Sequence, residues 1–214
     1  MSSRSPMPEA RVILREGVEV EHPLDVALAF FEAYSSYEAG DSSRPNSFDE
    51  RDLRRANRGG ARISATEIEA ILERRRAIER SLRAIPPGAS LADVTGSIPW
   101  SPMTRLFDGF ADIRGVGFSK MTKALHRKRP ALIPMLDSIV QAYLTRDDSR
   151  TGSTDFGERA TALVRSYKRD LDRNRSALRE LKRELGNRKY ATTEVRILDL
   201  LIWSAEDSER RSRS

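Results

Sequence analysis

The chain has 214 residues, and the 38% of them that are hydrophobic provide enough apolar material for one packed domain of ordinary to large size. It lacks cysteine, which excludes disulfides, thiol catalysis and a cysteine-held iron–sulfur cluster, and its two histidines, His22 and His126, lie far apart, so a histidine-based metal centre is poorly supported. Thirty-eight lysines and arginines against 32 aspartates and glutamates give a net charge of +6, which suits a polyanionic partner, although a solvated arginine-rich surface has the same balance.

The N-terminal part is polar and contains proline. Residues 1–10 are expected to be mobile, and Arg11 to Glu21 alternate as in a short extended segment that ends at His22-Pro23. Residues 1–22 therefore form a tail or short extended segment ahead of the domain. No stretch has the length and hydrophobicity of a signal peptide or a membrane span, so we expect a cytoplasmic protein without a membrane partner.

Helical periodicity begins at Leu24 and continues to about Tyr37. Most residues of the apolar stripe are aromatic: Ala27, Phe30, Phe31, Tyr34 and Tyr37. Such a stripe is typical of a core-facing helix, and base stacking is the alternative. A loop is expected over Gly40 to Pro45. Ser47 then caps a short helix through Arg55, which Asn57-Arg58-Gly59-Gly60 ends.

A capping box at Ser64 and Glu67 predicts the start of the next helix. Its buried face consists of Ile68, Ile71, Leu72, Ile78 and Leu82. Pro86-Pro87-Gly88 stops the chain, and residues 85–88 are a possible lobe boundary. Ser101 and Pro102 suit the N-cap and first position of a further helix. Its apolar face is Met103, Leu106, Phe107 and Phe110.

The stretch from Ile113 to Leu144 is organised around a glycine turn. Gly115-Val116-Gly117 permits positive φ and close approach of a ligand to the backbone. The next helix starts near Phe118, and its buried face is Phe118, Met121, Thr122 and Leu125. Its free N-terminal amides therefore lie beside the glycine amides, and together they predict a small anion site.

Basic residues follow on and after this helix: Lys120, Lys123, His126, Arg127, Lys128 and Arg129. Phosphate contacts need both aimed amides and cations, and this stretch supplies both. The predicted nucleic-acid-binding residues are Gly115, Val116, Gly117, Ser119, Lys120, Lys123, Arg127, Lys128 and Arg129. Double-stranded DNA is the expected partner, and no cofactor is expected. Alternatively, Lys128 and Arg129 pair with carboxylates of the core or of helix ends.

The two helices and the turn resemble a helix-hairpin-helix motif. Its apolar-x-Gly-Val-Gly pattern is present as Ile113, Gly115, Val116 and Gly117. Downstream, the resemblance extends to the HhH-GPD base-excision DNA glycosylases, in which a catalytic aspartate starts the next helix, as Asp137 does here. The interval from Ser119 to Asp137 (137 − 119 = 18) matches the family's interval between its lysine and its aspartate. Bifunctional members carry a nucleophilic lysine at the position of Ser119, and Lys120 is turned about 100° from it around the helix. Strand cutting through a Schiff base is therefore not expected.

A closer resemblance is to an uncharacterised bacterial family with two sequence phrases. The first joins Gly-Val-Gly to Lys-Arg-Pro-x-Leu-Ile-Pro and Asp-Ser-x-Val, here at 128–134 and 137–140. The second is Leu-Arg-x-Leu-Asp followed by an apolar run and Trp, here from Val195 through Asp199 to Trp203. The resemblance covers about residues 95 to 205 and implies no activity.

The C-terminal part begins with a polar connector from Asp147 to Gly157. A long helix from Glu158 to Leu185 then carries a heptad seam: Ala160, Val164, Tyr167, Leu171, Asn174, Leu178, Leu181 and Leu185. This seam suits packing inside a helical bundle, which we favour, or a homodimeric coiled coil through residues 158–185. Gly186-Asn187 ends the helix, and Thr192 is expected to cap a last apolar one before a polar tail at 207–214.

These elements predict an all-α fold, a helical bundle around a helix-hairpin-helix motif with a glycosylase-like scaffold, in a single domain over residues 23–206. Three functions compete. The first is DNA binding without catalysis, which we favour, and the second is a monofunctional DNA glycosylase that uses Asp137 near the sugar. Asp137 also suits the N-cap of the helix that begins at Ser138, a role compatible with either function. The third is a protein-interaction module that uses the helix at 158–185.

Overall fold

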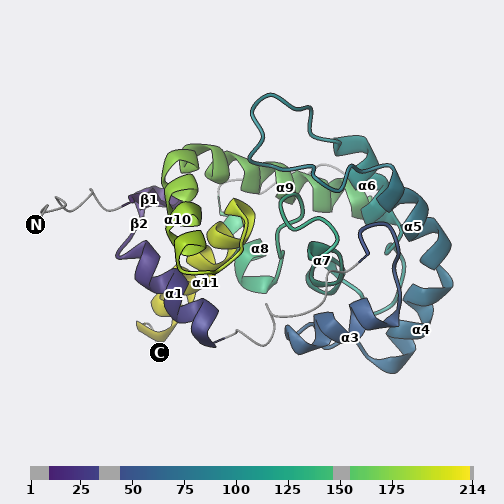
Figure 1. Ribbon diagram of the computed structural model, residues 1–214. Coiled ribbons are helices and arrows are strands. Elements are labelled where there is room, and N and C mark those ends of the chain that lie inside the picture. The colour runs from purple at the N-terminus through teal and green to yellow at the C-terminus, as the bar shows by residue number, and fades with distance from the viewer. Residues whose placement is uncertain (1–9, 34–43, 147–154, 213–214) are drawn as a thin grey trace, which may run out of the picture.

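The computed structural model describes residues 10–33, 44–146 and 155–212. Over these residues the chain is helical apart from one small two-stranded sheet, which confirms the all-α class (Figure 1). The predictions for the N-terminal tail, for Tyr34 and Tyr37, for most of the loop at 40–45 and for the connector at 147–154 lie outside the described residues. In the described part of the chain, no helix is long and apolar enough to cross a membrane.

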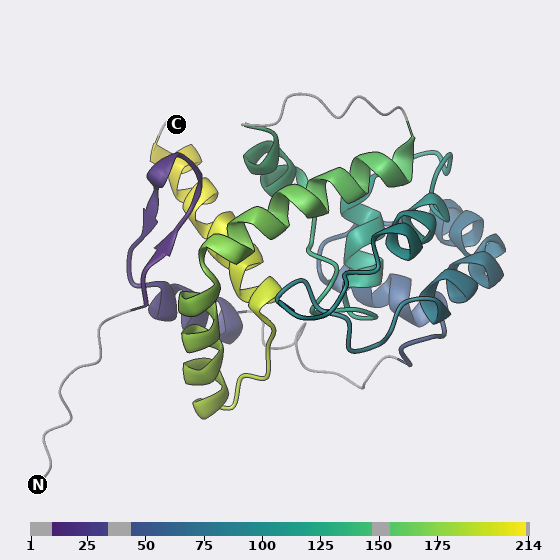
Figure 2. The same ribbon diagram turned by 90° about the horizontal axis from the view of Figure 1, so that it is seen from above.

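The N-terminal elements are a short hairpin and one helix. Strand β1 (Val12–Ile13) pairs with β2 (Glu19–Val20) in antiparallel register around a 3-10 turn at Arg15–Gly17. The predicted extended segment over Arg11 to Glu21 is thus extended only in these two short strands, and the chain turns back between them. Helix α1 (Pro23–Ala33) follows and packs against the last two helices, so elements from the beginning and the end of the chain lie side by side (Figures 1 and 2).

The aromatic stripe of α1 divides between the core and a partly exposed face. Phe31 is 2% exposed and stacks on Tyr190, with ring centroids 5.5 Å apart. Phe30 is half-buried and meets Trp203 edge to face at 6.4 Å. The stripe is therefore only partly a core feature.

Five helices make up the middle of the chain: α3 (Glu50–Arg58), α4 (Ala65–Glu73), α5 (Arg75–Arg83), α6 (Trp100–Asp108) and α7 (Phe118–His126). The N-cap of α3 is Asp49, not Ser47, because Asp49 Oδ1 accepts the Arg51 amide at 2.9 Å. The Ser64–Glu67 capping box opens α4, as predicted.

The helix expected from the Ser64 capping box to about Leu82 is two helices. The backbone of Arg74 leaves helical geometry at φ −89° and ψ 4°, so α4 and α5 meet there at a bend. Helix α6 starts two residues earlier than predicted, with Pro99 as N-cap and Trp100 as first residue. Its buried residues nevertheless include Met103, Leu106 and Phe107 of the predicted face.

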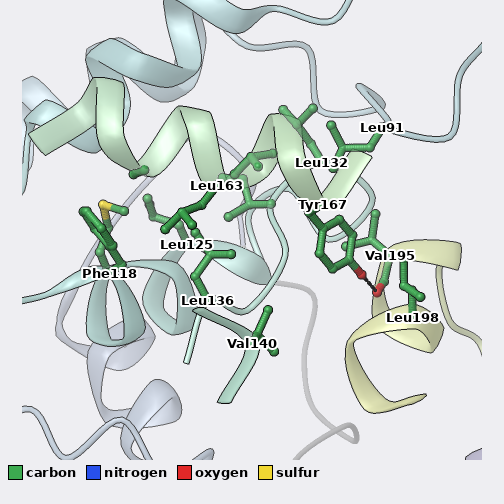
Figure 3. Packing of buried hydrophobic residues seen from close by; sticks show 14 of the residues in the cluster. Leu91, Phe118, Leu125, Leu132, Leu136, Val140, Leu163, Tyr167, Val195 and Leu198 are labelled. Atoms are coloured by element: carbon green, nitrogen blue, oxygen red, sulfur yellow. Dashed lines mark hydrogen bonds between the residues drawn. The ribbon is translucent and has the colours of Figure 1, made fainter. Parts of the chain in front are cut away.

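Helices α8 (Ser138–Thr145) and α9 (Phe156–Arg173) link the five middle helices to the C-terminal helices. Helix α9 packs on α6 and runs along the molecule towards α10 (Arg175–Asn187) and α11 (Glu194–Ser212) (Figures 1 and 2). Figure 3 shows Leu163 of α9 close to Leu125, and Tyr167 donating a hydrogen bond to the Val195 carbonyl at 2.6 Å. One hydrophobic cluster therefore joins both parts of the chain.

The predicted heptad helix breaks at Asn174, where α9 ends and α10 begins. The Asn174 side chain accepts the Ile13 amide at 2.7 Å and donates to the Ile13 carbonyl at 2.8 Å, which fixes β1 against the break. All the predicted seam residues are buried within the chain, as in the intramolecular packing that the sequence favours.

The last helix differs from its prediction at both ends. Thr193, not Thr192, caps α11, since its hydroxyl accepts the Arg196 amide at 3.1 Å. The helix continues to Ser212, whereas a polar tail was expected from residue 207.

Candidate nucleic-acid interface and pocket

The glycine turn has part of the predicted geometry. Gly115 has φ +83°, the left-handed region that favours glycine, and the Val116 amide donates to the Ile113 carbonyl at 3.0 Å. Val116 is 6% exposed, so it closes the core beneath the turn. Gly117 has φ −97° and is the extended N-cap of α7, so the expectation of positive φ is wrong there.

The carboxylate of Glu67 lies directly on this turn. A Cβ added at Gly115 would be 2.2 Å from Glu67 Oε1. Lys120 Nζ donates to both oxygens of this carboxylate, at 2.6 and 2.7 Å. The predicted anion site therefore adjoins a negative charge of the protein itself, and Lys120 is already paired.

Lys128 and Arg129 are buried, at 3% and 0% exposure. Lys128 Nζ pairs with Asp52 Oδ1 at 2.7 Å. The Arg129 guanidinium donates to the carbonyls of Leu82 and Ile85, among others. The sequence offered the alternative that Lys128 and Arg129 pair with carboxylates of the core or of helix ends. Lys128 does so, because Asp52 lies in the first turn of α3. Arg129 is also an interior residue, but it binds carbonyl groups. In this structure neither side chain is exposed to solvent.

Of the remaining residues near α7, one is buried and the others are half-buried. His126 is 4% exposed, and burial lowers its pKa to about 3, so the ring is neutral and does not belong to a basic surface. Ser119 and Arg127 are half-buried near the two ends of α7. Lys123 is also half-buried, and its side chain lines a pocket.

Asp137 caps α8 and lines the same pocket. Its Oδ1 accepts the amides of Ile139 (3.0 Å) and Val140 (2.9 Å), which confirms the predicted N-cap. Among the described residues, no hydrogen bond or ion pair engages the second oxygen, Oδ2. The residue is half-buried, so one oxygen fixes the side chain and the other remains available to a ligand.

The pocket has a volume of about 520 Å³ and collects residues from distant parts of the sequence. Four cationic side chains line it: Arg58 and Arg62 near the end of α3, Lys123 of α7 and Arg196 of α11. Two carboxylates, Asp137 and Asp199, and two aromatic rings, Phe30 and Trp203, also line it. With both carboxylates ionised, the side chains of the pocket carry more positive than negative charge.

Lys123 is the predicted DNA contact that the structure brings next to Asp137. Burial lowers the pKa of Lys123, the charges of Arg196 and Arg62 lower it further, and the charge of Asp137 opposes this. Its Nζ makes a long hydrogen bond, 3.4 Å, to the carbonyl of Gly60. Lys123 is four residues after Ser119, so both lie on one face of α7.

Sequence reasoning gave no site role to several residues of the pocket, among them Arg196, Asp199 and Trp203 of α11. Trp203 was expected among the apolar residues of the last helix, and Arg196 and Asp199 were noted only as part of the family's second sequence phrase. The Arg196 guanidinium lies 4.9 Å from the centre of the Phe30 ring, and Asp199 Oδ2 accepts the Met135 amide at 3.0 Å. The sequence did contain a sign of Asp199, because a carboxylate within an apolar helical run is costly to bury unless it has a structural or functional role.

The pocket offers no metal-binding cluster. Within the described ranges, no group of three or more His, Cys, Asp or Glu is placed to hold a metal ion. The chemistry available to the pocket is that of carboxylates, an amine, guanidinium groups and aromatic rings.

The fold and the pocket define an all-α protein with a charged, aromatic-walled pocket that residues of α1, α3, α7, α8 and α11 line. A family of unknown function (DUF6308) matches residues 19–206, and the chain belongs to that family. This confirms the uncharacterised family expected from the sequence, with a match that begins well upstream of residue 95. No curated protein and no solved structure gives a match to the chain.

Proposed function

We propose that the protein binds duplex DNA and takes one base into the pocket, where it hydrolyses the N-glycosidic bond. The observation that carries the proposal is the placement of Asp137, which caps α8 through one oxygen and presents its side chain to the pocket. A carboxylate that is fixed in this way can stabilise positive charge on the sugar or activate water. This favours the catalytic alternative over DNA binding alone.

Two further features support a nucleotide as the ligand. The rings of Phe30 and Trp203 offer apolar surface to a base taken out of the stack. Arg58 and Arg62 are exposed at the same pocket, where cations attract the phosphates on either side of that nucleotide. DNA contact is thus proposed at the pocket and at the N-terminus of α7, without Lys128 and Arg129.

The reaction is proposed to leave the strand intact. Ser119 offers no amine at the position of the lysine in bifunctional glycosylases, so water is the nucleophile and an abasic site is the product. A second candidate is favoured by Lys123, an amine with lowered pKa in the pocket of Asp137. In that candidate Lys123 attacks the sugar and the strand is cut.

A panel of duplexes that contain deaminated, alkylated or oxidised bases tests the proposal. The protein should release a free base from at least one duplex, and Asp137→Asn should abolish release while DNA binding remains. Asn also caps helices, so the variant should fold normally. Borohydride separates the candidates, because it traps a covalent complex only if Lys123 attacks. No base release from any duplex would leave DNA binding as the only function to pursue.

A further inference from the structure

Asp199 is a buried carboxylate whose bonding is incomplete. It is 3% exposed and lines the pocket from α11. Its Oδ2 accepts the Met135 amide, but Oδ1 is buried and has no hydrogen-bond partner in the described part of the chain. The nearby Tyr167 hydroxyl donates to the Val195 carbonyl at 2.6 Å, and although it also acts on the Asp199 carboxyl, it leaves Oδ1 without a hydrogen bond of its own.

A buried oxygen without a donor is costly, and two changes relieve the cost: protonation of the carboxyl group, or a donor from a ligand. Burial raises the pKa of Asp199 to about 7, and the charge of Asp137 acts in the same direction. The charge of Arg196, the Met135 amide and the Tyr167 hydroxyl oppose this rise. Lys123, Arg58 and Arg62 face the same pocket and also favour the charged form.

The two carboxylates of the pocket therefore differ in environment. Asp137 is half-buried and accepts two amides at a helix N-terminus, which is a place for an anion. Asp199 is fully enclosed and accepts one amide. Two carboxyl groups with such unequal surroundings are the arrangement from which acid and base roles arise.

We propose that Asp199 is the acid that protonates the leaving base, while Asp137 acts on the sugar. This inference rests on the proposed function. The Asp199 proton passes to a ring nitrogen of the base as the C1′–N bond breaks, and the bonding electrons leave with the base. Water adds to C1′ and gives its proton to Asp137. Solvent then returns a proton to Asp199 and removes one from Asp137, so the net change is addition of water across the bond.

The test compares two kinds of base. A neutral base needs a proton in order to leave, whereas 7-methylguanine is already cationic and leaves without one. Single-turnover release from both duplexes should be measured from pH 5 to 9 for the wild type and for Asp199→Asn. Asn keeps an oxygen that can accept the Met135 amide, so the variant removes the proton and keeps the contact.

For the neutral base, Asp199→Asn should lower the release rate by about 10²- to 10⁴-fold. The wild-type rate should fall about tenfold for each pH unit above the Asp199 pKa. For 7-methylguanine, the variant should stay within a few-fold of the wild type. Glu206→Gln is the matched control, because Glu206 is also a buried carboxylate of α11 but pairs with Arg146 away from the pocket.

Three outcomes overturn the inference. In the first, Asp199→Asn lowers the release rates of both bases equally. In the second, the variant keeps the pH profile of the wild type, and in the third, the wild type releases only 7-methylguanine. The pH profile of the wild type needs no folded variant, so it decides the matter even if Asp199→Asn does not fold. Failure of the proposed function looks different, because the wild type would then release neither base.

Discussion

The carboxylate of Glu67 and the ammonium group of Lys120 form a two-pronged ion pair on the glycine turn, at 2.6 and 2.7 Å. Burial acts to raise the pKa of Glu67, but the Lys120 hydrogen bond and the Ser64 amide outweigh it, so the pKa lies below its usual value. Glu67 is therefore charged at neutral pH. A negative charge of the protein thus lies directly beside Gly115.

The first prediction is that Glu67→Gln strengthens DNA binding. Removal of the negative charge frees Lys120 for a phosphate, so affinity at low salt should rise by about three- to tenfold. The slope of log affinity against log salt should steepen by about one. Binding isotherms at several salt concentrations measure both. Glu69→Gln removes the same charge from an exposed site of α4 and should have little effect. Equal effects of both variants would show that only net charge matters.

The second prediction separates the two glycines of the turn. Gly115→Val forces φ +83° on a branched residue and pushes a Cβ against Glu67, so it should cost about 1 to 3 kcal/mol of folding free energy. A Cβ added at Gly117 meets no atom within 4 Å, and the φ there is ordinary, so Gly117→Val should change stability little. If phosphates approach the N-terminus of α7, Gly117→Val should still weaken DNA binding. Urea unfolding and binding assays test the pair, and normal binding by Gly117→Val would exclude this contact.

The third prediction contrasts a buried arginine with an exposed one. Arg129→Met removes the guanidinium that donates to the carbonyls of Leu82 and Ile85, and among the described residues only the Leu82 carbonyl keeps a backbone donor, the Ile85 amide. The variant should therefore cost about 3 to 5 kcal/mol of folding free energy. Its affinity for DNA per folded molecule should not change. Arg58→Ala should leave stability within about 0.5 kcal/mol and weaken DNA binding, since Arg58 is exposed at the pocket. The reverse pattern would show that the basic stretch after α7 faces DNA after all.

Local patterns predicted the helices well where the cause of a boundary is local. The Ser64–Glu67 capping box and the Asp137 cap are examples, because the residues that bond lie three or fewer positions apart. The break at Asn174 has a distant cause, its paired hydrogen bonds with Ile13. A heptad pattern continues through that position, so sequence periodicity alone gave one helix instead of two.

The same distinction applies to the pocket. Asp137 was found from its place after the turn, but its neighbours Arg58, Arg196 and Phe30 come from helices far along the chain. Lys128 and Arg129 were misjudged for a related reason. Basic residues are usually solvated, and nothing local shows that Asp52 and the end of α5 enclose these two.

The last prediction concerns the effect of pH on stability through Asp199. Burial raises its pKa in the folded protein to about 7, whereas an exposed aspartate has about 3.9. The folded state therefore holds the proton more tightly than the unfolded state. The stabilisation that this provides is fully present below about pH 4 and is lost as the pH rises through 7. Three units of pKa correspond to about 4 kcal/mol.

The variant Asp199→Asn has no titrating group at this position, so its stability should not fall in this way as the pH rises. Urea unfolding of both proteins at pH 4, 5, 6, 7 and 8 gives the difference between their unfolding free energies. That difference should shift in favour of the variant by up to about 4 kcal/mol between pH 4 and 8, with most of the change between 4 and 7. Other titrating groups are common to both proteins and cancel in the difference. Parallel stability curves would mean that Asp199 is ionised with an ordinary pKa, and its role as an acid would then lose its physical basis.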